Sequence, residues 1–213
     1  MRDADRDPGA VRWEIPEPVA SASGKPAEGS LRALFVPYGT DGLRPGPDIE
    51  NYGNDTEFNE RQATAVRAEQ LKGMPRKYRD VVEKRRITRL AIRTYLSRET
   101  SHGAGEPSYL VEVGVTRFAD RGSVRLTVDA YRGMAASDVF DEGPVIKGHK
   151  DAVCVRARDD EDDDELVALE CVAGIGDLLV SFSATGSDPT DTEGITTLVA
   201  KQLGRIGDAG RAV

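Results

Sequence analysis

Residues 151–173 read DAVCVRARDDEDDDELVALECVA, two apolar segments on either side of seven consecutive acidic residues. We interpret the segments 151–158 and 166–173 as the two strands of a hairpin that turns at the acidic run, residues 159–165. In that register Cys154 lies opposite Cys171, and directly opposed residues of an antiparallel pair have Cα atoms about 4.5–5.5 Å apart, within disulfide range. The sequence therefore predicts a Cys154–Cys171 disulfide across the first hairpin of a terminal meander.

The cysteine pair bears on the compartment in which the protein works. Two buried free thiols are the alternative, because cysteine is a common small core residue. Disulfides persist in oxidising compartments, so we expect an extracytoplasmic protein, secreted or membrane-anchored. The opening residues MRDADRD lack the apolar segment of a secretory signal, and no run approaches the ~20 apolar residues of a transmembrane helix. We therefore expect that a signal or anchor preceded Met1, with a cytoplasmic location as the alternative.

Composition excludes one class of partner. The chain has 213 residues, a net charge of −8 and a pI near 5.0, whereas proteins that bind nucleic acid usually carry a basic excess. We therefore expect no nucleic-acid partner. Hydrophobic and charged contents of 38% and 31% fit one soluble domain with a tail. Arginine outnumbers lysine, which is typical of a GC-rich genome.

Proline spacing divides the chain. Most of the 11 prolines fall within residues 1–50, together with glycine and serine, and no helical or strand period is sustained there. We interpret 1–50 as a flexible linker or tether, in which the apolar patch LRALFVP (31–37) can lie against the folded part. A single α+β domain is expected over 51–208, and a frayed tail over 209–213.

Apolar periodicity divides the domain into elements. In chain order they are helices over 58–72 and 75–86, strands over 90–96 and 109–115, a helix over 120–136, the two cysteine strands, a strand over 178–184 and a helix over 192–206. The segment 120–136 also fits an alternating strand and is assigned as a helix on its length. Asn54, Asp55 or Thr56 is expected to cap the first helix, and Gly207 to end the last. We expect an α+β fold, an antiparallel sheet of about five strands covered by helices.

No catalytic signature is visible. The acidic run has no glycine at the sixth position of a calcium loop, and His102 and His149 belong to no ligand motif. The chain also has no Gly-x-Ser-x-Gly elbow and no glycine-rich phosphate loop. We therefore predict no catalytic residue, no cofactor and no metal site, and we interpret the acidic run as a solvated hairpin tip.

One region has a charge opposite to that of the chain. Between Lys72 and Arg93 nine basic residues stand against two acidic ones, a local charge of +7. Such a patch can recognise an anionic surface, such as lipid headgroups, a cell-wall polymer or an acidic protein. A solvated helix face is the alternative. The residues predicted to form the patch are Arg76, Lys77, Arg79, Lys84, Arg85 and Arg86.

Segments between Met74 and Ile206 resemble known proteins. MPRKYR (74–79), IRTY (92–95), KGHKDAVC (147–154) and the closing amphipathic helix are similar to uncharacterised secreted or membrane-anchored proteins of actinobacteria. The order of helices around a cysteine-bearing meander also resembles PsbP-like lipoproteins and the extracytoplasmic sensor domains of receptor kinases. These resemblances imply a non-enzymatic envelope module that binds a small ligand, a lipid or another envelope protein, and they assign no site residue. An envelope hydrolase with a dispersed site and a cytosolic interaction protein remain alternatives.

Overall fold

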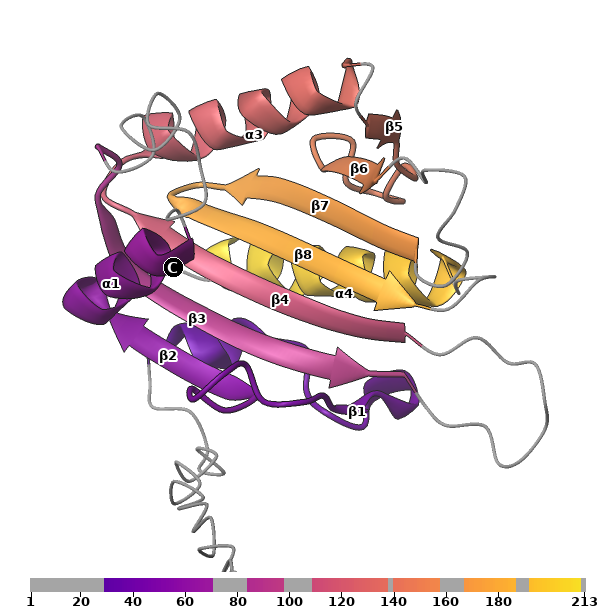
Figure 1. The fold of residues 1–213 in the computed structure, drawn as a ribbon, viewed down its shortest axis with the longest axis horizontal. Coiled ribbons are helices and arrows are strands. Elements are labelled where there is room, and N and C mark those ends of the chain that lie inside the picture. Colours follow the sequence, from indigo (N-terminus) through magenta and orange to yellow (C-terminus); the bar gives the residue numbers. More distant parts are fainter. Residues whose placement is uncertain are drawn as a thin grey trace, which may run out of the picture.

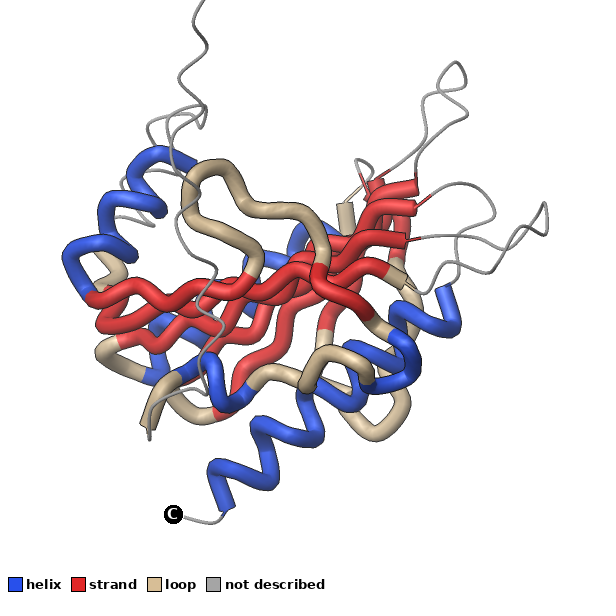
Figure 2. The backbone as a smooth tube through the Cα atoms, turned by 90° about the horizontal axis from the view of Figure 1, so that it is seen from below, coloured by secondary structure: helices blue, strands red, loops and turns tan. Residues whose placement is uncertain are grey.

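A single antiparallel sheet organises the chain. The structure, a computed structural model, describes residues 29–70, 84–97, 109–137, 140–157, 167–186 and 192–211. Eight strands form the sheet in the order β1-β3-β4-β8-β7-β6-β5, and β2 also pairs with β3. Figure 1 shows the sheet face-on with α4 behind it, and Figure 2 shows helices on both sides of the strands.

The strand count exceeds the expected five. The strands are β1 (Arg44–Pro45), β2 (Asp55–Asn59), β3 (Ile87–Leu96), β4 (Tyr109–Phe118), β5 (Phe140–Glu142), β6 (Val153–Ala157), β7 (Val167–Ile175) and β8 (Leu178–Gly186). The three strands that the sequence did not predict, β1, β2 and β5, are two to five residues long, too short for an alternating pattern to show. The α+β class with an antiparallel sheet is confirmed.

The cysteine hairpin has the register that the sequence predicts. β6 pairs with β7 so that Val155 lies opposite Glu170 and Cys154 opposite Cys171. A disulfide joins the two cysteines, whose Cα atoms are 4.0 Å apart. β7 then pairs with β8 in a meander. The acidic run between β6 and β7 lies outside the described residues.

The C-terminal helix covers one face of the sheet. α4 (Thr192–Arg211) buries the five apolar residues of its predicted face against the strands: Ile195, Leu198, Val199, Leu203 and Ile206. The helix does not end at Gly207, and 209–211 are helical rather than a frayed tail, because helical hydrogen bonds continue beyond the buried stripe. Residues 212–213 lie outside the described residues. None of the helices in the described ranges has the length and apolar character that a membrane span requires.

The segment 29–43, here called the strap, covers the same face beside α4. It contains the 3-10 helices η1 (Leu31–Leu34) and η2 (Thr40–Gly42), and the Ser30 hydroxyl caps η1 by accepting from the Arg32 N–H. Leu31 and Phe35 are each 1% exposed and belong to the main core. The flexible linker expected over 1–50 is therefore wrong for residues 29–50, whereas the expectation that the apolar patch 31–37 lies against the folded part is confirmed. The elements in this segment are only two to four residues long, too short to show a period in the sequence.

Two of the described helices pack on the opposite face. α1 (Glu60–Gln70) begins later than the predicted residue 58 because 55–59 form β2, so none of the three residues expected as its cap serves as one. Asn59 caps it instead: its side-chain oxygen accepts from the Gln62 N–H, and the Gln62 side chain accepts from the Asn59 N–H, a capping box. α3 (Arg121–Ala135) confirms the helix expected over 120–136 and is capped by Asp120.

The described helices on this second face lie over only part of the sheet. α1 packs over β2 and β3 through Ala63 and Val66, while α3 packs near β7 through Val124 and Val128. Between them the middle of β4 and β8 carries no described helix (Figure 1). We call this uncovered region the polar strip, and its residues are Glu112, Gly114, Ser181 and Ser183, from neighbouring positions of β4 and β8.

Candidate functional site

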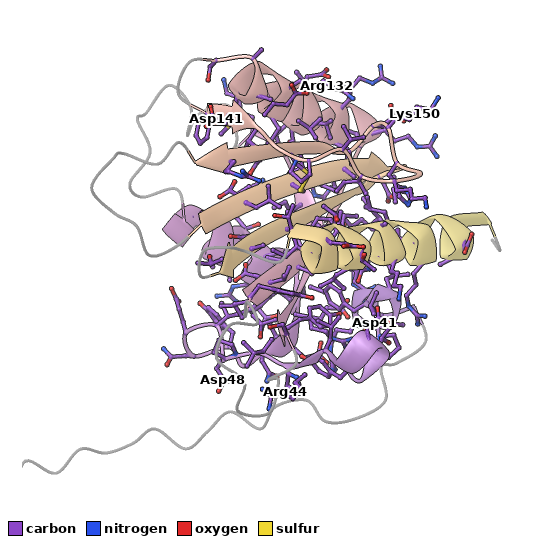
Figure 3. The ribbon with its side chains drawn as sticks, turned by 90° about the vertical axis from the view of Figure 1, so that its right-hand side faces the viewer. Asp41, Arg44, Asp48, Arg132, Asp141 and Lys150 are labelled. Carbon is purple, nitrogen blue, oxygen red and sulfur yellow. A yellow bond between two sulfur atoms is a disulfide. The ribbon has the colours of Figure 1, made fainter. Side chains whose placement is uncertain are left out.

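The disulfide is an interior crosslink. Cys154 and Cys171 are 5% and 1% exposed and lie in the core that faces α4 (Figure 3). Attack on a disulfide requires access for a thiolate, which this burial denies. The bond therefore stabilises the sheet and offers no redox chemistry at the surface.

Half of the predicted basic patch lies within the described residues. Lys84, Arg85 and Arg86 form a turn that leads into β3, rather than the end of a helix reaching residue 86. Lys84 and Arg86 are exposed and Arg85 is partly exposed. The other three residues of the patch, Arg76, Lys77 and Arg79, lie outside the described residues.

The structure adds basic residues that the sequence reading did not connect with this patch. Ile87 pairs with Phe118, and the Ala119 N–H donates to the Arg86 carbonyl at 3.0 Å, so the start of β3 lies beside the end of β4. Asp120 then starts α3, whose first turns carry further arginines. Six basic residues gather at this end of the sheet: Lys84, Arg85, Arg86, Arg117, Arg121 and Arg125. We call this set the basic end.

Only part of the basic end is neutralised. Arg86 makes a two-pronged ion pair with Glu60, with N–O distances of 2.7 and 3.0 Å, and Arg117 lies 3.4 Å from Asp177. The side chains of the other four make no ion pair or hydrogen bond with the described residues: Lys84, Arg85, Arg121 and Arg125. With Asp120 counted as the third acidic residue, six positive charges stand against three negative ones, a local excess of +3.

Asp120 forms no ion pair with the described cations of the basic end. Its carboxylate accepts from the Ser123 N–H and the Ser123 hydroxyl, both at 2.8 Å. These hydrogen bonds are the main reason why the pKa of Asp120 is lowered, and the nearby charge of Arg85 lowers it further. The carboxylate is therefore committed to capping α3, and the four unpaired cations remain available to a partner.

A second group of charges lies beneath the strap and is structural. The Asp55 carboxylate on β2 binds Arg32 of the strap at 2.6 Å and Arg93 of β3 at 2.9 Å. The Arg93 guanidinium lies between the rings of Phe35 and Tyr38, 4.9 and 5.0 Å from their centroids. Asp55 and Arg93 side chains are 11% and 8% exposed, so this cluster offers no access to a substrate.

Polar groups on the second face of the sheet are more accessible. The Tyr131 hydroxyl of α3 donates to Glu170 of β7 at 3.0 Å, and burial raises the pKa of Tyr131. Glu112 on β4 is partly buried, and burial raises the pKa of its carboxyl group. The sequence alternation of β4 had shown which face Glu112 occupies, but it did not mark the residue as functional.

The histidines provide no metal site within the described part of the chain. His149 lies in the turn before β6, where its N–H donates to the Ile146 carbonyl at 3.0 Å. His102 lies outside the described residues. The described residues hold no group of three or more His, Cys, Asp or Glu side chains arranged for a metal ion.

Comparison with known proteins gives one structural neighbour. No protein family matches the sequence, and no curated protein matches it. The fold is similar to the extracellular domain of PknH from Mycobacterium tuberculosis, with a TM-score of 0.47 and 13% identity over 85% of this chain and 98% of that chain. At this TM-score and identity the similarity carries no argument about function or location.

Proposed function

We propose that this protein is a non-enzymatic binding module of the cell envelope, working outside the cytoplasm, and that an anionic partner docks on the basic end. The observation that carries the proposal is the set of four cations without partners in the described residues, drawn from two segments more than thirty residues apart in sequence. Opposite charges placed across an interface steer association and set orientation. Although the chain has a net charge of −8, this end has the local positive charge that an anionic surface attracts.

The disulfide supports the proposed compartment. A crosslink between two core cysteines forms and persists where the environment is oxidising, which favours a location outside the cytoplasm. The basic end then faces components of the envelope, among which anionic lipids and acidic proteins both have the required charge.

Two matched double variants test the proposal. Arg121→Gln/Arg125→Gln removes two unpaired cations of the basic end, and Lys147→Gln/Lys150→Gln removes two exposed cations from the loop between β5 and β6. Figure 1 shows β5 and β6 near the C-terminal end of α3, away from the end where α3 begins. Both variants change the net charge equally, so a difference between them reports position rather than total charge.

Binding is measured by cosedimentation with vesicles that contain anionic phospholipid and by fluorescence anisotropy with polyglutamate. A cation near an anionic surface contributes about 1 kcal/mol, so losing two weakens binding by about 2 kcal/mol, roughly 30-fold. We expect this loss for Arg121→Gln/Arg125→Gln with at least one probe, and a clearly smaller effect for the control. Equal losses for the two variants, or no binding by the unmodified protein, would refute the proposal.

A further inference from the structure

The polar strip places a carboxylate beside two hydroxyls. Glu112 of β4 lies opposite Ser183 of β8, and Gly114 lies opposite Ser181. Antiparallel partners share a face of the sheet, so all four positions look toward the side of α1 and α3. Gly114 has no side chain, and a Cβ built there would lie 2.6 Å from the Ser181 hydroxyl oxygen, so this hydroxyl occupies the space above β4 next to Glu112.

Glu112 has no partner in the described part of the chain, although it is partly buried. On its other side it faces Thr94, whose hydroxyl donates to the Pro47 carbonyl at 2.7 Å. No described side chain donates to the Glu112 carboxylate, and loss of water around it raises its pKa. An unpaired, partly dehydrated carboxylate costs stability, and such groups are common where a ligand completes the pairing.

A second carboxylate lies on the other side of the polar strip. Glu170 of β7 is two strands from Glu112 in the same row, through Ser183, so the two Cα atoms are about 10 Å apart. The Glu170 carboxylate accepts a hydrogen bond from the Tyr131 hydroxyl of α3, and this bond keeps the carboxylate next to that helix. Ser183 lies between these two glutamates and Ser181 in the next row, and neither hydroxyl makes a hydrogen bond within the described residues.

We propose that the polar strip binds a small organic cation that carries an ammonium group next to a hydroxyl group, with Glu112 as the counter-charge and the two serine hydroxyls as hydrogen-bonding partners. A carboxylate complements a cation, and hydroxyls exchange hydrogen bonds with a ligand hydroxyl. The described residues group no third metal-binding side chain here, which favours an organic cation over a metal ion. This inference goes beyond the proposed function and uses none of the residues of the basic end.

Ethanolamine is a suitable probe, because it carries one ammonium group beside one hydroxyl. Backbone amide shifts of the full chain are followed by NMR during titration with ethanolamine and with N-acetylethanolamine, the neutral analogue. We expect ethanolamine to shift the amides of Glu112, Ser181 and Ser183 together, and the neutral analogue to bind at least tenfold more weakly. Equal effects of the two compounds, or no shift at the strip, would overturn the proposal.

Two variants separate the site from general charge effects. Glu112→Gln keeps the shape of the side chain and removes its charge, and Glu142→Gln removes one exposed charge from β5 as the matched control. We expect Glu112→Gln to weaken ethanolamine binding at least tenfold and Glu142→Gln to leave it unchanged. If Glu112→Gln retains full binding, Glu112 is not the counter-charge. Vesicle binding through the basic end is expected to be the same in both variants, so failure of one proposal leaves the other testable.

Discussion

Replacing Asp55 with asparagine removes the carboxylate that Arg32 and Arg93 share beneath the strap. Both guanidiniums are largely buried, with side chains 13% and 8% exposed, so water cannot replace the lost counter-charge. Breaking a buried ion pair from one side typically costs about 3–5 kcal/mol, because the remaining charge is left uncompensated. The rings of Phe35 and Tyr38 on either side of Arg93 offset part of this cost, so we expect the lower half of that range.

Urea unfolding followed by circular dichroism measures the loss. With a urea dependence of about 2 kcal/mol per molar, a loss of about 3–4 kcal/mol lowers the unfolding midpoint by about 1.5–2 M. The control is Glu60→Gln, which breaks the exposed pair with Arg86 and is expected to change the midpoint little, because exposed ion pairs contribute little. If Asp55→Asn lowers the midpoint no more than Glu60→Gln does, the buried cluster does not hold the strap as argued.

The same cluster predicts how stability depends on pH. Burial alone would raise the pKa of Asp55, but hydrogen bonds from Arg32 and Arg93 outweigh it and hold this pKa below its usual value. Because the folded-state pKa is lowered, the stabilisation is fully present above the unfolded pKa of about 3.9 and is lost as pH falls through the folded value. The difference in midpoint between the unmodified protein and Asp55→Asn is therefore expected to shrink only in strongly acidic solution.

Two further substitutions test the sheet. Cys154→Ser/Cys171→Ser removes the crosslink between two residues with a sequence separation of 17. By the chain-entropy relation for a loop near this length, the free energy of unfolding falls by about 3 kcal/mol. Thermal unfolding measures this loss, and an unchanged midpoint would contradict a stabilising role. Glu112→Gln is expected to raise stability at neutral pH, since a raised folded-state pKa makes the ionised carboxylate unfavourable in the fold. This gain in stability disappears below the unfolded pKa of about 4.3, where the carboxyl group is protonated in both the folded and the unfolded state. Urea midpoints measured across pH report the gain. A gain that does not depend on pH would show that ionisation is not its cause.

Long periodic patterns predicted the parts of the fold that depend on one buried face. The cysteine hairpin and α4 each bury a regular stripe of apolar residues, so sequence spacing placed them, while α3 was separated from an alternating strand by its length. The strap shows the opposite case. Its Leu31 and Phe35 are buried by α4 and the sheet, and Gln202 of α4 fixes it by donating to the Leu34 carbonyl at 2.8 Å and accepting from the Val36 N–H at 2.9 Å. The apolar patch 31–37 indicated that this segment could lie against the folded part, but nothing in the local sequence of either segment reveals the pairing with Gln202.

Polar strands are equally hard to predict. β2 reads DTEFN, a sequence rich in turn formers, and only Phe58 in it is fully buried. Its acidic residues are tolerated because basic residues meet them: Asp55 lies opposite Arg93, and Glu57 pairs with Arg89. Local propensity therefore favoured a helix cap, and tertiary charge pairing favoured a strand.

The basic end was only half predicted for a related reason. Lys84, Arg85 and Arg86 form a run that charge counting finds, whereas Arg121 and Arg125 belong to a helix with mixed charges. Their proximity follows from the pairing of Ile87 with Phe118, which brings the start of β3 beside the start of α3. Considering the predicted β3–β4 hairpin together with the helix after it would have placed Arg121 and Arg125 beside the run 84–86.

The width of the polar strip depends on how closely α3 approaches β7. Gly174 permits a short approach, because a Cβ built on it would lie 2.8 Å from a methyl carbon of Val124. The helix therefore lies close to β7 at this point and leaves the β8 hydroxyls uncovered, while its Tyr131 reaches Glu170. Any larger residue at position 174 pushes α3 away from β7 and alters the position of Tyr131 relative to Glu170. The access of a ligand to Glu112 is thus coupled to a glycine two strands away, through the packing of one helix.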